Sequence, residues 1–180
     1  MAASPHSKSS VEHVSFERER GVYALEVMRD VAHAVIQVGE DAGRIGRIQR
    51  VFSKFASAKI PVFLIKLHRS AVTLAFAASD TSRAVKALGE DGLTADVKDG
   101  LALLVVRAGS MRDLHGIMAN IADSLFEAAA RLYETGDSHN SVQCLIEAES
   151  AEAAAARLCA HFHLPADAVK YSSVAVEGAE

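Results

Sequence analysis

The chain has 180 residues; half are hydrophobic, 23% are charged, and the formal net charge is −4. This composition is typical of a globular protein with enough apolar material for one medium or two small domains. It argues against nucleic-acid binding, because phosphate recognition needs a positive field. The longest apolar run, Leu101 to Val106, has six residues, whereas a membrane span needs about 20.

The N-terminal segment and the cysteines do not indicate a secreted or metal-binding protein. Residues 1–20 are polar and serine-rich, without the apolar centre of a secretory signal, and predict a flexible tail on a cytoplasmic protein. The two cysteines, Cys144 and Cys159, lack metal-ligand spacing and are expected to be reduced, buried thiols. We therefore predict no metal, no cofactor and no membrane partner.

The stretch from Val31 to Leu88 is written twice, and the second copy starts at Leu101. Each copy has an aliphatic run, a glycine-containing loop, a helical pattern, two further strands and an alanine-rich helix. Equivalent positions lie about 70 residues apart: Ile36 and Val106, Phe76 and Ile146, Leu88 and Leu158. A repeat of this length, present only twice, predicts two copies of one small domain.

In the first copy, alternating and β-branched residues predict strands over 31–38, 62–67, 71–77 and 93–97, after an edge strand over 21–28. A helix follows the turn 39–43, and its apolar stripe is predicted to be Ile45, Ile48, Phe52 and Phe55. Arg44, Arg47 and Arg50 are expected in solvent. Ser79 or Asp80 is expected to cap a second helix, with Ala84, Val85 and Leu88 facing inward.

In the second copy, strands are predicted over 101–106, 130–135 and 141–146, with one more in the tail around Val169, Tyr171 and Val174. The apolar stripe of its first helix is Leu114, Ile117, Ile121, Leu125 and Phe126. Ser150 is expected to cap a helix over 151–162.

This order predicts an α+β fold of two ferredoxin-like βαββαβ domains, each an antiparallel sheet with two helices on one face. Domain 1 is expected over residues 21–98 and domain 2 over 99–180, and an exchange of one strand between them stays open. The uncovered sheet faces are apolar at alternate positions. They should therefore pack against each other or against another chain.

Three segments carry a resemblance to a known family: VGEDAGRIGRIQRVF, VVRAGSMRDLHGIMANI and GDSHNSVQCLIEAES. Over residues 21–164 their order and spacing resemble the tandem ACT domains of aspartate kinases, which are small-molecule-binding regulatory modules. The kinase domain and its Lys-Phe-Gly-Gly motif are absent from the sequence. The chain thus looks like the family's stand-alone regulatory subunits, which consist of the ACT pair.

The resemblance implies an amino-acid effector, lysine or threonine, bound at interfaces of ACT domains in a homodimer, and a catalytic kinase subunit as partner. It places ligand-binding residues in the first-copy loop, in the start of the next strand, and in the second-copy equivalents: Glu40, Asp41, Ala42, Gly43, Pro61, Val62, Phe63, Met111, Arg112, Asp113, Asp137 and Ser138. Phe63 and Tyr133 stand where relatives hold an ammonium-binding Asp, which this chain therefore lacks.

Purely structural roles also fit several of these residues. A helix N-terminus suits a carboxylate and nearby acids suit an ammonium, but Glu40 to Gly43 also fits a plain turn, and Asp113 a plain helix cap. Asp137-Ser138-His139 lies on one tight turn and so does not form a hydrolase triad, which needs converging side chains. His161 and His163, two apart on a helix, do not face each other as metal ligands would.

Three functions are compatible with this pattern. The first is a non-catalytic amino-acid sensor that regulates an enzyme. The second is an ACT-type scaffold that dimerises without a ligand, which Phe63 and Tyr133 favour. The third is an RNA-recognition module, which shares the strand and helix order but needs exposed aromatics and a basic surface. We expect the sensor, with no catalytic residues.

Overall fold

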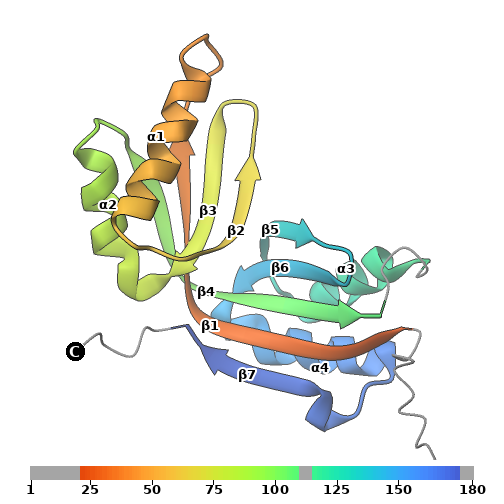
Figure 1. Ribbon diagram of the computed structural model, residues 1–180. Coiled ribbons are helices and arrows are strands. Elements are labelled where there is room, and N and C mark those ends of the chain that lie inside the picture. Colours follow the sequence, from red (N-terminus) through yellow and green to blue (C-terminus); the bar gives the residue numbers. More distant parts are fainter. Residues whose placement is uncertain (1–20, 110–114, 175–180) are drawn as a thin grey trace, which may run out of the picture.

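The computed structural model describes residues 21–109 and 115–174. The first copy contains β1 (Val22–Gln37), α1 (Arg44–Ser57), β2 (Val62–Leu67), β3 (Ala71–Ala77), α2 (Thr81–Gly89) and β4 (Ala95–Ala108). The second continues with α3 (Ile117–Glu127), β5 (Leu132–Asp137), β6 (Ser141–Glu147), α4 (Ala151–Phe162) and β7 (Val169–Ser173). The predicted strand and helix order is therefore confirmed within these residues (Figure 1).

The repeat is visible in the register of the sheet. In the first copy Ile36 is the antiparallel partner of Val72, and in the second copy Val106 is the partner of Val142. Both pairs are related by the same shift of 70 residues. Even the irregularity between Val62 and Leu64 on β2 recurs between Leu132 and Glu134 on β5.

Two long strands run through both copies and join them. The sheet order is β2-β3-β1-β4-β6-β5, with β7 paired to β1 in parallel. β1 and β4 each pass from one copy into the other, and they bend near Asp30 and Gly100, whose φ angles are 62° and 74°. Figure 1 shows β1 running along the second copy and then turning into the first.

The first segment of β1 corrects the predicted edge strand over 21–28. These residues are continuous with the next predicted strand and lie between β4 and β7. Leu25 and Val27 are fully buried there, because they pack in one apolar cluster with residues of α3 and α4, while β7 pairs with the edge of β1. The first copy thus lends a strand to the sheet of the second.

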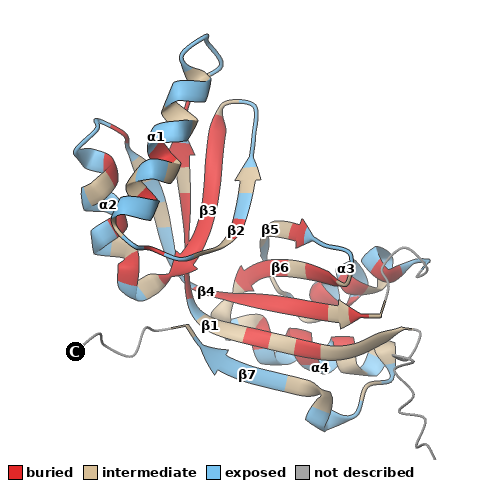
Figure 2. Cartoon of the chain, viewed as in Figure 1, coloured by how far each residue is buried: buried red, intermediate tan, exposed pale blue. Residues whose placement is uncertain are grey.

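Three apolar clusters hold the fold together. One packs α1 and α2 on the first part of the sheet, and a second packs α3 and α4 on the other part. The third joins the uncovered sheet faces of the two copies through residues such as Val31, Leu64, Leu103 and Leu145. The predicted association of the open faces therefore occurs within the chain. Buried residues line β3, β4 and β6 in Figure 2.

Three residues predicted on buried stripes are exposed instead: Ile45 by 76%, Val85 by 46% and Phe126 by 87%. Val51 and Phe55 define the buried face of α1. Ile45 precedes Val51 by six residues, which places it about 120° around the helix. Phe126 is displaced by about 100° from its neighbour Leu125. Leu114 lies outside the described residues.

Helix capping also differs from the prediction. α4 spans Ala151–Phe162 as expected, but neither Asp80 nor Ser150 makes a side-chain cap hydrogen bond. Each helix is instead preceded by one turn of 3₁₀ helix, over Ala78–Asp80 and Ala148–Ser150. Such a turn supplies backbone hydrogen bonds at the helix start, which makes a side-chain cap unnecessary.

Candidate functional site

A cavity of about 470 Å³ in the second copy lies between the start of α3 and the β5–β6 hairpin. Its lining residues are Gly116, Ile117, Met118, Thr135, Gly136, Asp137, Ser138 and Val142. We call it the loop cavity. Two of the predicted ligand-binding residues, Asp137 and Ser138, therefore lie in one cavity with the beginning of a helix.

The helix end of the loop cavity offers backbone N–H groups. Gly116 is the N-cap of α3 and has a φ of 77°, and its carbonyl accepts the amide of Asn120 at 3.0 Å. The first amides of a helix have no acceptor within the helix, and they carry a partial positive charge. Among the described residues no side chain caps them. This end of the cavity suits a carboxylate or another small anion.

The hairpin end offers oxygen atoms. Asp137 is exposed, and it has no hydrogen-bond or ion-pair partner in residues 21–109 and 115–174. The Ser138 hydroxyl lies 2.8 Å from that of Ser141 and donates to Asn140 Oδ1 at 3.2 Å. A cavity with a carboxylate at one end and a helix N-terminus at the other can bind a zwitterion. The carboxylate binds the ammonium group, and the helix N-terminus binds the carboxylate of the ligand.

The equivalent loop of the first copy is filled by its own side chains. Asp41 Oδ1 accepts hydrogen bonds from Arg47 Nη2 and the Gly43 amide, both at 2.7 Å. The bond from Arg47 is the main reason that the pKa of Asp41 lies below its ordinary value, and the Gly43 amide acts in the same direction. Arg47 also donates from Nε to the Val38 carbonyl at 2.6 Å.

Two more contacts tie this loop to the β2–β3 turn. Arg44 donates to the carbonyls of His68 and Arg69 at 2.8 and 2.9 Å, and Glu40 forms an ion pair with Arg69 at 2.5 Å. The prediction that Arg44 and Arg47 stay in solvent is therefore wrong. Both side chains donate to backbone carbonyls of the loop and the turn, which need hydrogen-bond donors. Ala42 is exposed, and both loop acids are already paired.

The other predicted residues are not gathered at these loops. Pro61 to Phe63 begin β2, whereas Glu40 to Gly43 adjoin its far end, roughly 20 Å away for a six-residue strand. Val62 packs in the first-copy core, and Phe63 in the cluster between the copies. Met111, Arg112 and Asp113 lie outside the described residues.

Sequence reasoning did not assign Ile117, Met118, Thr135, Gly136 or Val142 to a ligand site, although they line the loop cavity. The composition places the start of the turn at Gly136, but β5 continues through Asp137. The repeat could have indicated Val142, because Val142 aligns with Val72, which lies beside the first loop.

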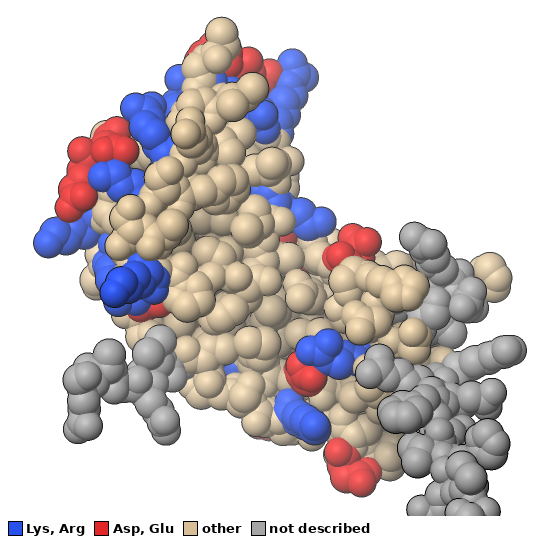
Figure 3. Space-filling model, in the orientation of Figure 1, with Lys and Arg blue, Asp and Glu red and all other residues tan. Residues whose placement is uncertain are grey.

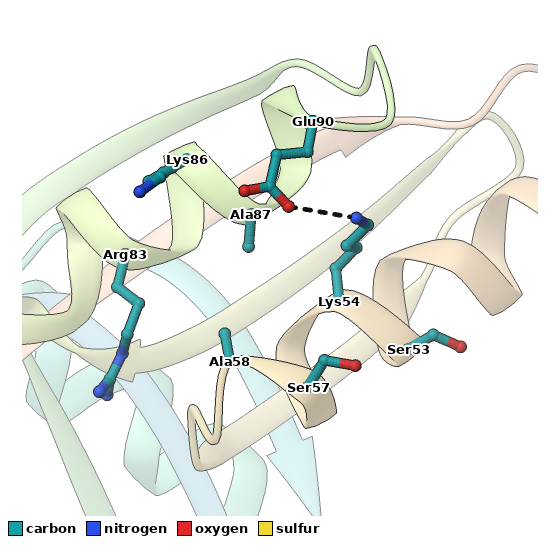
Figure 4. A pocket seen from close by; sticks show the side chains of 8 residues that line it. All are labelled: Ser53, Lys54, Ser57, Ala58, Arg83, Lys86, Ala87 and Glu90. Carbon is teal, nitrogen blue, oxygen red and sulfur yellow. Dashed lines mark hydrogen bonds and ion pairs between the residues drawn. The ribbon is translucent and has the colours of Figure 1, made fainter.

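A second cavity, of about 350 Å³, lies between α1 and α2 and is lined by Ser53, Lys54, Ser57, Ala58, Arg83, Lys86, Ala87 and Glu90. Figure 4 shows Lys54 reaching Glu90 across it. Lys54 also pairs with Asp91 at 3.1 Å, and Arg83 pairs with Asp80. Charges of both signs therefore crowd these helices, at the upper left of Figure 3, which leaves little net attraction for an anion.

The described residues hold no group of three or more His, Cys, Asp or Glu side chains placed to bind a metal ion. No helix among them is long and apolar enough to cross a membrane. Cys144 and Cys159 are unbonded, and burial raises the pKa of Cys144 to about 12, so it stays a thiol. Cys159 is half-buried rather than buried.

The architecture is two βαββαβ units on a common sheet. Solved structures of aspartate kinases share it, although no family model and no curated protein matches the sequence. The structure of aspartokinase alpha and beta subunits matches with a TM-score of 0.73 at 21% identity, covering 80% of this chain and 100% of that one.

The ligand-free regulatory subunit of aspartate kinase from Thermus thermophilus matches with a TM-score of 0.72 at 18% identity, covering 79% of this chain and 99% of that one. The aspartate kinase of Clostridium acetobutylicum matches at 0.72 and 12% identity, over 82% of this chain and 37% of its own length. In fold, the chain therefore matches a whole regulatory subunit, and it matches 37% of the length of the Clostridium kinase.

Proposed function

We propose that this protein is a non-catalytic regulatory protein that binds a free amino acid in the loop cavity. The single observation that carries the proposal is that the carboxylate of Asp137, which has no partner among the described residues, lies in one cavity with the N-terminus of α3. These groups complement the ammonium and the carboxylate of an amino acid. Lysine and threonine are the first candidates, because of the resemblance to aspartate kinases.

The proposal extends to the partners. The aspartokinase structure similar to this chain contains alpha and beta subunits, so a catalytic kinase subunit is the proposed target of regulation. Effector binding would change the affinity for that subunit by a coupling free energy of about 1–3 kcal/mol. We propose a cytoplasmic homodimer as the regulatory unit.

Thermal unfolding with each of the proteinogenic amino acids tests the sensor. An effector at about 100 times its Kd should stabilise the protein by about 2.7 kcal/mol. Asp137→Asn should weaken that effector at least tenfold, because it removes the negative charge that faces the ammonium. Asp123→Asn, on the exposed side of α3, is the matched control and should bind normally. The sensor hypothesis fails if no amino acid shifts the melting curve.

A ligand-free scaffold is the second candidate, and the free edge of β2 favours it. Ile65 and Leu67 on this edge strand are 47% and 56% exposed, and an unpaired apolar edge is suited to pair with another chain. Sedimentation analysis of Leu67→Lys tests this contact. The variant should dissociate at concentrations where the wild type is a dimer, and an unchanged dimer would place the contact elsewhere.

A further inference from the structure

One acidic side chain interrupts the apolar contact between the two copies. Glu134, on β5 of the second copy, is only 14% exposed and points into the first copy. Around it, Leu64, Leu103 and Val31 form the apolar cluster that joins the sheets. A buried carboxylate in such a place is costly unless hydrogen-bond donors surround it.

Three side chains of the first copy share a single oxygen of this carboxylate. Thr73 Oγ1 on β3 donates to Glu134 Oε2 at 2.8 Å. His68 Nε2, in the turn after β2, lies 3.3 Å from the same oxygen, and His33 Nε2 on β1 lies 3.8 Å from it. We call these four residues the polar latch. Every contact in it with Glu134 crosses from one copy to the other.

The two histidines differ in their access to solvent. The His68 side chain is 48% exposed. His33 is 8% exposed, and its Nε2 has no hydrogen-bond partner among the described residues. Burial is the main cause that lowers the pKa of His33; His68 acts in the same direction, whereas Glu134 and Asp96 oppose it. His33 is therefore neutral in the closed contact at neutral pH.

Other charged side chains lie near the latch. Lys98 on β4 is the register partner of His33, and its Nζ lies 5.3 Å from the centre of the Tyr133 ring. Lys66 on β2 is the register partner of Thr73. Asp96 on β4 is a further acid that attracts a proton on His33, but burial outweighs the attraction of Glu134 and Asp96, because the pKa of His33 is lowered overall.

We propose that the polar latch is a proton-sensitive switch, in which protonation of His33 weakens the contact between the two copies. His33 is buried and its Nε2 has no hydrogen-bond partner among the described residues, so a proton there places a poorly solvated charge inside the cluster. Moving the copies apart relieves this cost by returning the imidazole to water.

The direction of the pH dependence follows from linkage. With the copies apart, His33 would titrate near its ordinary pKa of 6.5, and in the closed contact its pKa is lower. The open form therefore binds more protons, so the closed contact loses stability as the pH falls below 6.5. Above that pH both forms hold neutral His33, and the contact is unaffected by its titration.

Hydrogen exchange of the ligand-free, full-length protein tests the switch at about pH 7.5 and about pH 5.5, spanning the usual histidine range. After correction for intrinsic exchange, peptides over β2 and β5 should exchange faster at the lower pH. The exchange rate should rise by about tenfold for each pH unit by which the pKa of His33 in the open form exceeds that in the closed form. Peptides over α2 and α4, far from the contact, should change less.

Variants identify the responsible groups. His33→Gln should abolish most of the pH dependence, and His68→Gln should reduce it. His161→Gln is the matched control, because His161 pairs with Glu127 at 3.5 Å within the second copy; it should behave as the wild type. Equal exchange at both pH values, or a pH dependence that survives His33→Gln, would overturn the proposal.

A measurement on the wild type guards against a variant that does not fold. The imidazole of His33, followed by NMR, should titrate below its ordinary pKa of 6.5. Titration of His33 at or above 6.5 would contradict the switch. Protection of β5 that rises with added Zn²⁺ would also overturn it, since the cluster would then be a metal site.

Discussion

The helix-entry loops of the two copies have the same place in the fold but different contents. In the first copy Arg47 reaches back to Asp41 and to the Val38 carbonyl, and Arg44 reaches the β2–β3 turn. Seventy residues later the sequence has Leu114 and Ile117, which cannot donate hydrogen bonds. The difference teaches that the two helix entries are filled differently: Arg47 occupies the first, whereas in the described part of the second a cavity lies beside Ile117.

The same contrast extends to the helix faces. The groove between α1 and α2 is lined by lysine, arginine, glutamate and serine. In the second copy, the outer side of α3 exposes Met118 by 50% and Phe126 by 87%. Exchanging residues between equivalent positions is therefore a direct way to test which differences matter.

The largest effect is expected from Gly136→Lys, which copies Lys66 into the second copy. A Cβ atom at Gly136 would lie 2.5 Å from Leu64 Cδ1 and 3.1 Å from Gln143 Oε1. Overpacking of this kind costs about 1–3 kcal/mol, and here it would push the two copies apart. Chemical denaturation measures the loss. Gly46→Ala, which meets nothing within 4 Å, is the control and should stabilise α1 by about 0.5–1 kcal/mol. A Gly136→Lys variant as stable as the wild type would contradict the close packing.

A smaller effect is expected from Arg47→Ile, which gives the first loop the residue of the second. It removes the half-buried hydrogen bond to the Val38 carbonyl and the contact with Asp41. The expected loss of unfolding free energy is about 1–2 kcal/mol. Arg50→Ile, at an exposed position of the same helix, should change it by at most about 0.5 kcal/mol. If both variants lose the same amount, Arg47 does not hold the loop.

The smallest effect is expected from Arg107→Gln, which copies Gln37. Arg107 donates to both carboxylate oxygens of Glu26, at 2.6 and 2.8 Å, and ties β1 to β4 in the second copy. The pair is partly exposed, so solvent screening limits the loss to about 0.5–1 kcal/mol. Urea denaturation at neutral pH measures this loss.

The pH dependence of the same pair gives a second measurement. The hydrogen bond from Arg107 is the main cause that lowers the pKa of Glu26 below 4.5. Its stabilisation is present above pH 4.5 and is lost as the pH falls through the lower pKa of the folded state. In Arg107→Gln this part of the acid dependence should shrink. An acid dependence identical to the wild type would show that the pair adds nothing.

Much of the fold could be predicted from local patterns. The strands over 62–67 and 71–77 have the predicted bounds, because alternation and β-branched residues reflect burial on one sheet. The boundaries of β1 and β4 could not be predicted, since each strand continues through a polar interval around Asp30 or Gly100 where the pattern breaks. Pairing of β1 with β4 on both sides of these intervals keeps each of them in one strand.

The candidate site was partly predictable. The loop Glu40 to Gly43 and the turn with Asp137 were marked by composition, because helix starts and hairpins need particular residues. The sequence did not indicate that Arg47 would occupy the first loop, or that a cavity would lie beside Ile117 in the second copy. That outcome depends on the direction in which a long side chain such as Arg47 points. The direction is set by backbone carbonyls that need a donor, such as that of Val38.

The amino-acid sequence alone determined the duplication, the βαββαβ order and the apolar sheet faces. These follow from the hydrophobic periodicity and from the 70-residue spacing of equivalent positions. The tertiary structure decided how the copies share β1, which of two similar loops keeps a cavity, and that Glu134 meets His33, His68 and Thr73. Those features arise from contacts between residues far apart in the chain, which no local pattern encodes.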